Sequence, residues 1–426
     1  MIDIRIIRES PEIIKESLKK RFKEDKIKWI DEIIEKDKLS RKLKKEADDL
    51  RQKRNNLTSE INELKKKGKD IKKVLLEAKE IPEKIKEREL SYENLQNEIN
   101  YYLLRIPNIL HKSVPKGKDA SENKEIKKIG KITKKKEDIK NHSDLIEELG
   151  LADFETGRVV SGQGFNYLLG DLALLDLALQ RYGIDFLVKK GFLVIVPPIL
   201  IRKDAMEGVI NLSDFEEVIY KVDKEDLYLI GTAENSLVPL FKDKKIDYDK
   251  LPIKICAVTP CFRKEIGGHG VDTKGLFRMH QFNKVEQVIF SKPEESYRLL
   301  EKMQKITESF FESLEIPFRV IEICSGDLGD KQAKQYDIEA WFPRQDSYKE
   351  ITSASNCTDY QARRLNIKYL KKDTSRDYVH ILNNTMVATS RAMVAILENH
   401  QNKDNSVNIP KVLQPYMFGK KKISIK

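Results

Sequence analysis

The sequence lacks any long hydrophobic run, and charged residues make up 35% of its 426 residues. A membrane-spanning helix needs about 20 consecutive apolar residues, and no stretch of the chain approaches that length. The first ten residues, MIDIRIIRES, also lack the apolar segment of a secretory signal peptide. We therefore expect a cytoplasmic protein that does not act in a membrane.

Cysteine is scarce. The chain has four cysteines, Cys256, Cys261, Cys324 and Cys357, and no two of them are spaced as C-x-x-C. Close pairs would indicate a redox motif or a zinc ribbon, and a disulfide framework would indicate secretion. Reduced and mostly buried thiols are therefore expected.

Glycine is almost missing from the N-terminal part, where Gly68 is the only glycine between residues 28 and 104. Apolar residues recur there at helical spacing in two stripes on either side of the polar turn KKKGKD. The first stripe is Leu39, Leu43, Ala47, Leu50, Leu57, Ile61 and Leu64, and the second is Ile71, Val74, Leu75, Ala78, Ile81, Ile85, Leu95 and Ile99. The pattern predicts an antiparallel helical hairpin with limbs of about 50–60 Å, kinked at Pro82.

Positive charge is concentrated in the same part of the chain. Residues 1–150 hold 40 Lys and Arg against 31 Asp and Glu, whereas the remainder holds 40 against 38. A lysine-rich genome would raise the charge of both parts, so the asymmetry favours nucleic acid as a partner of the N-terminal part. The stripes alone fit a spacer or a dimerisation rod equally well.

The remaining chain alternates helix-like and strand-like segments. We expect an N-terminal helical arm at 1–112 with a coiled coil at about 28–104, a Pro- and Gly-containing linker at 113–141, and a second domain at 142–426. Strand-like segments in the second domain outnumber the helices that would connect parallel strands. An α+β class, with an antiparallel β-sheet flanked by helices, is therefore predicted.

The stretch CFRKEIGGHGVDTKGLFRMHQF, residues 261–282, predicts two strands joined by a loop rich in glycine and charge. Arg263 and Phe282 would meet across that hairpin, with Glu265 and Arg278 nearby. Arginine suits phosphate oxygens, and an aromatic face suits a stacked base. The stretch therefore indicates a nucleotide site, although a surface hairpin with ordinary ion pairs explains it about as well.

Several motifs, in order along the chain, resemble the seryl-tRNA synthetase family of class II aminoacyl-tRNA synthetases. Residues 261–287 resemble motif 2, GTAEN (231–235) the family's T-A-E serine loop, 336–369 its long signature, 382–401 motif 3, and the strand ending at Pro198 motif 1. The resemblance implies a tRNA-binding helical arm joined to a class II catalytic domain. It also implies ATP-dependent ligation of L-serine to serine tRNA through a seryl-adenylate, with a selenocysteine tRNA left open as a second substrate.

The resemblance implies a role for each residue at the ATP end of the site. Arg263 would bind the α-phosphate and the serine carboxylate, Glu265 the adenine amino group, and Phe282 the adenine ring. Arg278 and Arg391 would hold the β- and γ-phosphates. The full set implied for ATP is Arg263, Lys264, Glu265, Arg278, Met279, Phe282, Glu350, Ile351, Thr352, Ser353 and Arg391.

The same resemblance implies a magnesium ion between the phosphates. Glu350 and Ser353 would supply the oxygen ligands that Mg²⁺ prefers, and Glu350, Arg263 and Arg391 would act in catalysis. A rare form of the family binds serine through zinc. The four cysteines and six histidines show no convincing ligand spacing, and the T-A-E loop is typical of the metal-free form, so no zinc is expected.

Serine would be selected by a pocket that pairs its hydroxyl, because such a pocket rejects alanine strongly. The residues implied for serine are Thr232, Ala233, Glu234, Arg263, Glu286, Asn383 and Thr385. Glu286 and Glu234 would meet the ammonium, and Asn383 and Thr385 the side-chain end. Without the resemblance, Glu286 in the alternating KVEQVIF is better explained as an ordinary sheet carboxylate.

Motif 3 departs from the common bacterial pattern and is closer to archaeal and eukaryotic forms. It runs NNTMVATSR, with Asn384 and Thr385 in place of Gly and Ser at the serine end and with Arg391 retained. His269, in the motif 2 loop, is given no catalytic role. The resemblance also implies a homodimer formed through motif 1.

Two other functions are consistent with parts of the sequence. One is an RNA-binding or scaffold protein on a decayed synthetase core, which the retained Arg263, Glu265, Phe282 and Arg391 disfavour. The other is an enzyme that loads an amino acid onto a carrier protein, which the intact basic arm disfavours.

Overall fold

The computed structural model describes residues 1–211, 217–265 and 275–424. It divides into two compact units, Met1–Ile109 and Leu110–Lys426, each described here by itself. His269 lies outside the described residues. Within the described ranges, no helix is both long and apolar enough to cross a membrane.

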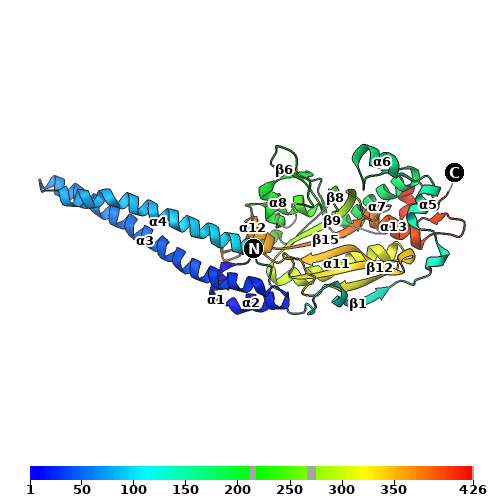
Figure 1. Ribbon diagram of the computed structural model, residues 1–426, viewed down its shortest axis with the longest axis horizontal. Coiled ribbons are helices and arrows are strands. Elements are labelled where there is room, and N and C mark those ends of the chain that lie inside the picture. Colours follow the sequence, from blue (N-terminus) through cyan, green and yellow to red (C-terminus); the bar gives the residue numbers. More distant parts are fainter. Residues whose placement is uncertain (212–216, 266–274, 425–426) are drawn as a thin grey trace. The chain divides into compact units, whose positions relative to one another are not determined.

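The first unit is helical. Its helices are α1 (Ile4–Glu9), α2 (Pro11–Lys20), α3 (Ile27–Lys66) and α4 (Lys72–Arg105). Helices α3 and α4 have 40 and 34 residues, which corresponds to about 50–60 Å each. They lie side by side as a hairpin (Figure 1) whose turn contains Gly68 at φ 64°. The predicted hairpin is confirmed, and α4 continues through Pro82.

A thin apolar seam and ion pairs between the limbs hold the hairpin together. Leu57, Ile81 and Ile85 form a buried cluster between the two helices. Arg51 pairs with Glu89 at 2.5 Å across the limbs. Exposed pairs of this kind contribute little, so most of the stability comes from the seam.

The predicted seam is wrong at two positions. Leu39 and Leu75 are 48% and 37% exposed. Near residue 40 the seam is polar instead, because Ser40 is buried and its Oγ accepts a hydrogen bond of 2.6 Å from Gln96 Nε2. A helix that turns Ser40 inward directs its neighbour Leu39 outward.

The second unit contains an eight-stranded sheet in the order β1-β10-β11-β12-β15-β9-β8-β4 (Figure 1). Its strands are β1 (Lys124–Ile129), β4 (Leu193–Val194), β8 (Ile253–Phe262), β9 (Gln281–Ser291), β10 (Phe318–Glu322), β11 (Lys334–Phe342), β12 (Ser347–Asn356) and β15 (His380–Ala388). Neighbouring strands are antiparallel except for β4 and β8, which are parallel. The predicted α+β class is confirmed.

Helices surround this sheet, and short strand pairs lie outside it. The helices are α5 (His142–Glu148), α6 (Phe154–Ser161), α7 (Gly170–Val188), α8 (Lys203–Val209), α10 (Glu234–Leu237), α11 (Ser296–Ser313), α12 (Tyr360–Arg364) and α13 (Thr389–Asn399). The short strands are β2 (Ala152–Asp153), β3 (Tyr167–Leu168), β5 (Leu200–Arg202), β6 (Leu227–Leu229), β7 (Lys245–Asp247), β13 (Lys368–Leu370), β14 (Arg376–Tyr378), β16 (Val407–Asn408) and β17 (Lys422–Ile423).

One face of the sheet carries most of the core. Residues of α7, α11 and α13 pack there in one buried cluster with Val285 and Ile289 of β9. Because successive side chains of a strand point to opposite faces, Lys284 and Glu286 lie on the other face. That second face carries the polar residues described below.

The stretch predicted as a linker differs from the prediction in one respect. Residues 113–141 contain strand β1, which pairs with β10 at the edge of the sheet. Its sequence KEIKKI is almost entirely exposed, so it has no alternating apolar pattern from which a strand could be predicted. Lysines of this kind protect sheet edges from pairing with other chains.

Candidate functional site

The candidate site begins where β8 and β9 leave the loop between them. The two strands pair with Cys261 opposite Phe282, and the Arg263 amide extends the ladder by donating to the His280 carbonyl at 3.0 Å. Arg263 and Phe282 therefore stand at the same end of the sheet, as expected from the sequence.

The Arg263 guanidinium joins two parts of the site. Its Nε donates to the Gly231 carbonyl at 3.1 Å, directly before Thr232, and its Cζ lies 5.6 Å from the centre of the Phe282 ring. Because Nε is used in this way, the plane of the guanidinium is fixed and its terminal nitrogens are presented beside the aromatic ring. Such a preorganised cation suits phosphate or carboxylate oxygens.

The other residues predicted near the loop also lie at this end. Arg278 Nη1 is 3.9 Å from Glu265 Oε2, and Glu265 adopts φ 44°. The Lys264 amide donates to the Val218 carbonyl at 2.9 Å. Positive φ is uncommon outside glycine, and such strain often occurs at ligand-binding positions.

A second arginine approaches from motif 3. Arg391, in the first turn of α13, donates from Nη1 to the Glu350 carbonyl at 2.9 Å and lies 3.4 Å from the Glu350 carboxylate. Its Cζ is 5.5 Å from the Phe277 ring centre. The structure thus brings the predicted cation Arg391 and the predicted metal ligand Glu350 into direct contact.

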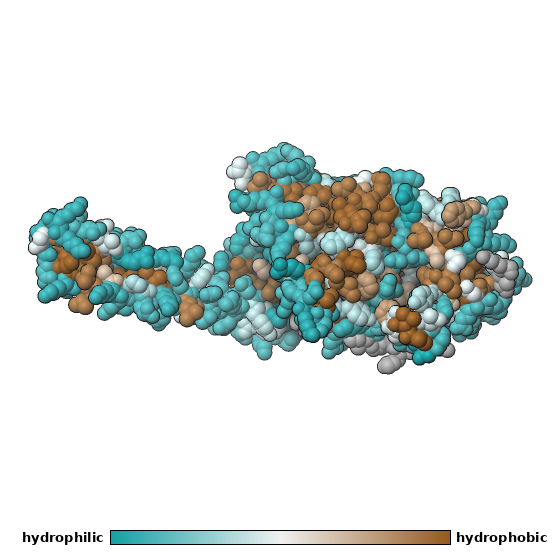
Figure 2. Space-filling model, turned by 90° about the horizontal axis from the view of Figure 1, so that it is seen from above, coloured by the Kyte–Doolittle hydropathy of each residue, from teal (hydrophilic) through white to brown (hydrophobic). Residues whose placement is uncertain are grey.

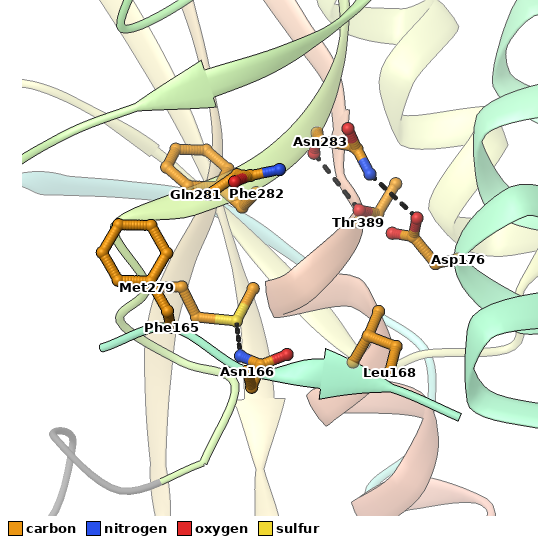
Figure 3. Close-up of a pocket in the computed structure, with 9 residues that line it drawn as sticks. All are labelled: Phe165, Asn166, Leu168, Asp176, Met279, Gln281, Phe282, Asn283 and Thr389. Atoms are coloured by element: carbon orange, nitrogen blue, oxygen red, sulfur yellow. Dashed lines mark hydrogen bonds between the residues drawn. The ribbon is translucent and has the colours of Figure 1, made fainter. Parts of the chain in front are cut away.

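A cavity of about 170 Å³ adjoins the predicted adenine end (Figure 3). It is lined by Phe165, Asn166, Leu168, Asp176, Met279, Gln281, Phe282, Asn283 and Thr389. Asn166 Nδ2 lies 2.8 Å from the sulfur of Met279, one of the residues predicted for ATP. The cavity touches the adenine end only and does not include Arg263 or the serine residues.

Asp176 of α7 connects three elements behind this cavity. Its Oδ2 accepts from Asn283 Nδ2 at 2.9 Å and from Gln180 Nε2 at 2.6 Å. Thr389, which starts α13, donates to the Asn283 carbonyl at 3.2 Å and lies beside Asp176 (Figure 3). Burial raises the pKa of Asp176, and these hydrogen bonds oppose that rise.

The residues predicted for serine form a compact polar cluster on the second face of the sheet, where Glu286 is 2% exposed. Glu286 Oε2 accepts from Thr232 Oγ1 at 3.1 Å and from Thr385 Oγ1 at 3.2 Å. Lys284 Nζ lies 2.9 Å from the same oxygen and 3.4 Å from Thr232 Oγ1. Glu286 is therefore a buried acceptor in contact with an ammonium group, which is the chemistry an amino-acid substrate requires.

Glu234 belongs to a neighbouring cluster. Its two carboxylate oxygens accept from Lys331 Nζ at 2.6 and 2.7 Å, and Oε1 also accepts from Gln361 Nε2 at 2.7 Å and Asn383 Nδ2 at 3.1 Å. Burial opposes the charged form of Lys331, but Glu234 and neighbouring groups outweigh it, so its pKa is raised. Burial raises the pKa of Cys357 to about 12, so this thiol is neutral.

Both residues predicted for the metal, Glu350 and Ser353, lie on β12. Ser353 is opposite Asp337 in the β11–β12 pair and hydrogen-bonds its carboxylate. Burial, followed by the negative charge of Glu350, raises the pKa of Asp337 well above its usual range. Ile351 and Thr352, between these two residues on the same strand, are buried, at 2% and 1% exposed.

Among the described residues, no group of three or more His, Cys, Asp and Glu side chains is arranged to hold a metal ion. Glu350 and Ser353 nevertheless fit Mg²⁺, which is usually held by one or two protein oxygens together with water and phosphate. The raised pKa of Asp337, caused first by burial and then by the charge of Glu350, holds this carboxyl toward its neutral form beside the two predicted ligands.

The sequence prediction missed several residues of the site. Lys284 could have been predicted, because it lies two positions before Glu286 on the same strand and therefore on the same face. Lys331, Asp337 and Asp176 carried no local signal. Lys331 meets Glu234 across 97 positions of sequence, which no spacing rule reveals.

Two family models match the chain. The model of the seryl-tRNA synthetase N-terminal domain matches residues 1–110, and the model of the tRNA synthetase class II core domain (G, H, P, S and T) matches residues 218–400.

Individual proteins match over nearly the full length. The serine–tRNA ligase of Methanocella arvoryzae is 49% identical over 98% of this chain and 99% of its own. The crystal structure of seryl-tRNA synthetase from Pyrococcus horikoshii complexed with ATP is 47% identical, covers all of both chains and has a TM-score of 0.95. That of the cytoplasmic serine–tRNA ligase from Naegleria fowleri in complex with AMP is 35% identical, covers 100% of this chain and 99% of its own, and has a TM-score of 0.89.

Proposed function

The chain belongs to the seryl-tRNA synthetase family and is a class II serine–tRNA ligase, and from this premise we propose how its residues share the reaction. The proposal rests on one observation above the others. Glu286, buried and hydrogen-bonded by Thr232 and Thr385, already contacts an ammonium group, that of Lys284. Arg263 stands beside this cluster through Gly231.

The reaction has two steps in this proposal. A carboxylate oxygen of serine attacks the α-phosphorus of ATP, the bond to the β-phosphate breaks, and seryl-adenylate and pyrophosphate form. A hydroxyl of the terminal adenosine of tRNA then attacks the carbonyl carbon of the adenylate, and AMP leaves. No covalent intermediate with the protein is involved.

Fixed cations carry the first step. Arg263 binds the α-phosphate and the serine carboxylate, where negative charge develops. Arg278 and Arg391 hold the β- and γ-phosphates, Phe282 stacks on the adenine and Glu265 accepts from its amino group. Lys264, Met279, Ile351 and Thr352 complete the nucleotide site, the last two through their backbones.

Glu350 and Ser353 would hold Mg²⁺ beside the phosphates, with Asp337 close by. The ion would supply positive charge that offsets the negative charge of the phosphates. Contact between Glu350 and Arg391 supports this placement, because it puts the ligand next to a phosphate-binding cation.

The second face of the sheet, which carries Lys284 and Glu286, binds serine. Glu286 receives the substrate ammonium in place of Lys284, with Thr232 orienting its carboxylate. Thr385 and Asn383 line the side-chain end, where a paired hydroxyl distinguishes serine from alanine. Glu234 and Ala233 belong to the same loop, and the contacts of Glu234 direct it toward Asn383.

The helical arm binds the long variable arm of serine tRNA in this proposal, because its exposed surface carries the excess of positive charge found in the sequence. The larger unit shows broad hydrophobic areas on its surface (Figure 2). Val196 and Leu193, in the motif 1 segment, are 92% and 62% exposed, which supports a homodimer formed there.

Pyrophosphate exchange driven by each of the twenty amino acids tests the assignment. We expect exchange with serine, and charging of serine tRNA by the same preparation. Exchange with threonine or alanine alone would overturn the pocket assignment. Transfer of serine to a carrier protein but not to tRNA would favour the alternative acceptor.

A further inference from the structure

Lys331 is the feature that the proposed mechanism leaves unused. It lies in the loop before β11, and its Nζ contacts both carboxylate oxygens of Glu234, at 2.6 and 2.7 Å. The two side chains are 19% and 6% exposed. Taking one partner from such a pair leaves the other as an uncompensated charge, which is strongly unfavourable.

The Glu234 carboxylate, held by Lys331, in turn orients a residue of the proposed serine pocket. Its Oε1 accepts from Asn383 Nδ2 at 3.1 Å. An ionised carboxylate can only accept hydrogen bonds, so the nitrogen of the Asn383 amide must face it. The Asn383 oxygen is then turned away from Glu234 and remains an acceptor for another donor.

The positive charge of Lys331 keeps this arrangement in place. Without Lys331, the Glu234 carboxylate would be an uncompensated buried charge and would move from its present position. The Asn383 amide would then lose the acceptor that orients it and could reverse, presenting its nitrogen instead of its oxygen. A substrate hydroxyl would then lose a fixed acceptor.

We propose that Lys331 is a positioning residue for serine selection, which acts through Glu234 to fix the Asn383 amide with its oxygen available to the serine hydroxyl. The inference rests on the proposed function, since it takes Asn383 as part of the serine pocket. Gln361 of α12, whose Nε2 donates to the same Glu234 oxygen at 2.7 Å, also holds this carboxylate in place.

Lys334 offers a matched control three residues further along the chain. It is 10% exposed on its side chain, pairs with Glu322 at 3.2 Å and lies 2.8 Å from Ser113 Oγ. Neither of these partners belongs to the residues proposed for serine. A purely structural effect of removing a buried lysine would therefore also be seen in Lys334→Met.

The test measures serine-dependent pyrophosphate exchange in the full-length Lys331→Met variant. We expect the KM for serine to rise about tenfold and the preference for serine over alanine, in kcat/KM, to fall about tenfold, because a lost hydroxyl partner weakens this discrimination. The KM for ATP should stay unchanged. Lys334→Met should change neither the serine KM nor the preference.

A double variant provides the rescue. In Lys331→Met combined with Glu234→Gln, the new amide oxygen at position 234 can accept from Asn383 without any charge, so the preference for serine should recover toward that of the unaltered protein. Serine and ATP KM values that rise together in Lys331→Met, an unchanged preference, or a double variant no better than the single one would each overturn the inference. Absence of serine-dependent exchange in the unaltered protein would instead overturn the proposed function, and this inference with it.

Discussion

Single residues of the site hold their positions through contacts made before any substrate arrives. The Nε of Arg263 is bonded to the Gly231 carbonyl, and its guanidinium faces the Phe282 ring. Electrostatic groups that are already oriented need no rearrangement as charge develops, which is why such groups accelerate reactions.

We predict that Arg263→Lys lowers kcat for serine-dependent pyrophosphate exchange by about 100–1000-fold. Lysine keeps the charge, but it lacks the planar fork that can bond Gly231 and still face a phosphate. Arg202→Lys is the control, because the Arg202 side chain is 73% exposed and its ion pairs with Asp204 and Asp226 are long, at 3.8 and 3.9 Å. A rate close to normal for Arg263→Lys would contradict the role given to this residue.

At the scale of single residues, the sequence was most informative where neighbours in space are also close in sequence. Arg263 and Phe282 could be paired because one hairpin brings them together. Lys331 and Asp337 could not be placed, since their partners Glu234 and Glu350 come from other elements. Their positions depend on tertiary packing rather than on any local pattern.

At the scale of elements, Asp176 joins α7, β9 and the start of α13. Through Asn283 it reaches the residue next to Phe282, and through Thr389 it reaches the turn that carries Arg391. The buried carboxylate of Asp176 thus fixes how α7 packs against β9 and the start of α13, the two segments that carry Phe282 and Arg391.

We predict that Asp176→Asn gains stability relative to the unaltered protein as pH rises from about 4 to 8. The pKa of Asp176 is raised by burial. A group with a raised folded pKa contributes stability below its unfolded pKa and loses it as pH rises through the folded value. Asparagine does not titrate and has no such loss.

Chemical unfolding at several pH values checks this prediction. The fluorescence of Trp341 monitors unfolding, in a Trp29→Phe background so that the signal comes from the larger unit alone. The difference in unfolding free energy between Asp176→Asn and its parent should move in favour of the variant as pH rises from about 4 toward the raised folded pKa of Asp176, and should level off above it. A difference independent of pH would show that Asp176 does not titrate in this range.

Elements with strong periodicity could be predicted and those without it could not. Helices α3 and α4 could be predicted from their apolar stripes. A stripe that continues without interruption wrongly places Leu39 and Leu75 in the seam, because the pattern does not show that the seam contains polar residues. Strand β1 was missed because KEIKKI is exposed along nearly its whole length. Its position is set by pairing with β10, a strand that lies far along the sequence.

At the scale of the whole molecule, the exposed apolar residues of the motif 1 segment call for a partner surface. We predict that Val196→Asp converts a dimer to a monomer, because it places a charge in the proposed interface, where that charge would be removed from water. Sedimentation velocity measures the change. Ile126→Asp on β1, where Ile126 is 44% exposed, is the control and should leave the dimer intact. A protein that is monomeric before any substitution would contradict the proposed homodimer.

The two compact units lead to a last prediction, that the arm serves the tRNA step and not the adenylate step. Deleting residues 30–100 removes most of α3 and α4. The join is feasible, because the Trp29 and Tyr102 rings on the two limbs lie only 5.6 Å apart, so a short Gly-Ser link can connect the cut ends.

All residues proposed for ATP and serine lie in the other unit. Serine-dependent pyrophosphate exchange should therefore continue, whereas charging of serine tRNA should fall at least about 100-fold, as expected when several phosphate contacts are lost. Equal loss of both activities would show that the arm also supports adenylate formation, and unchanged charging would show that tRNA is bound elsewhere.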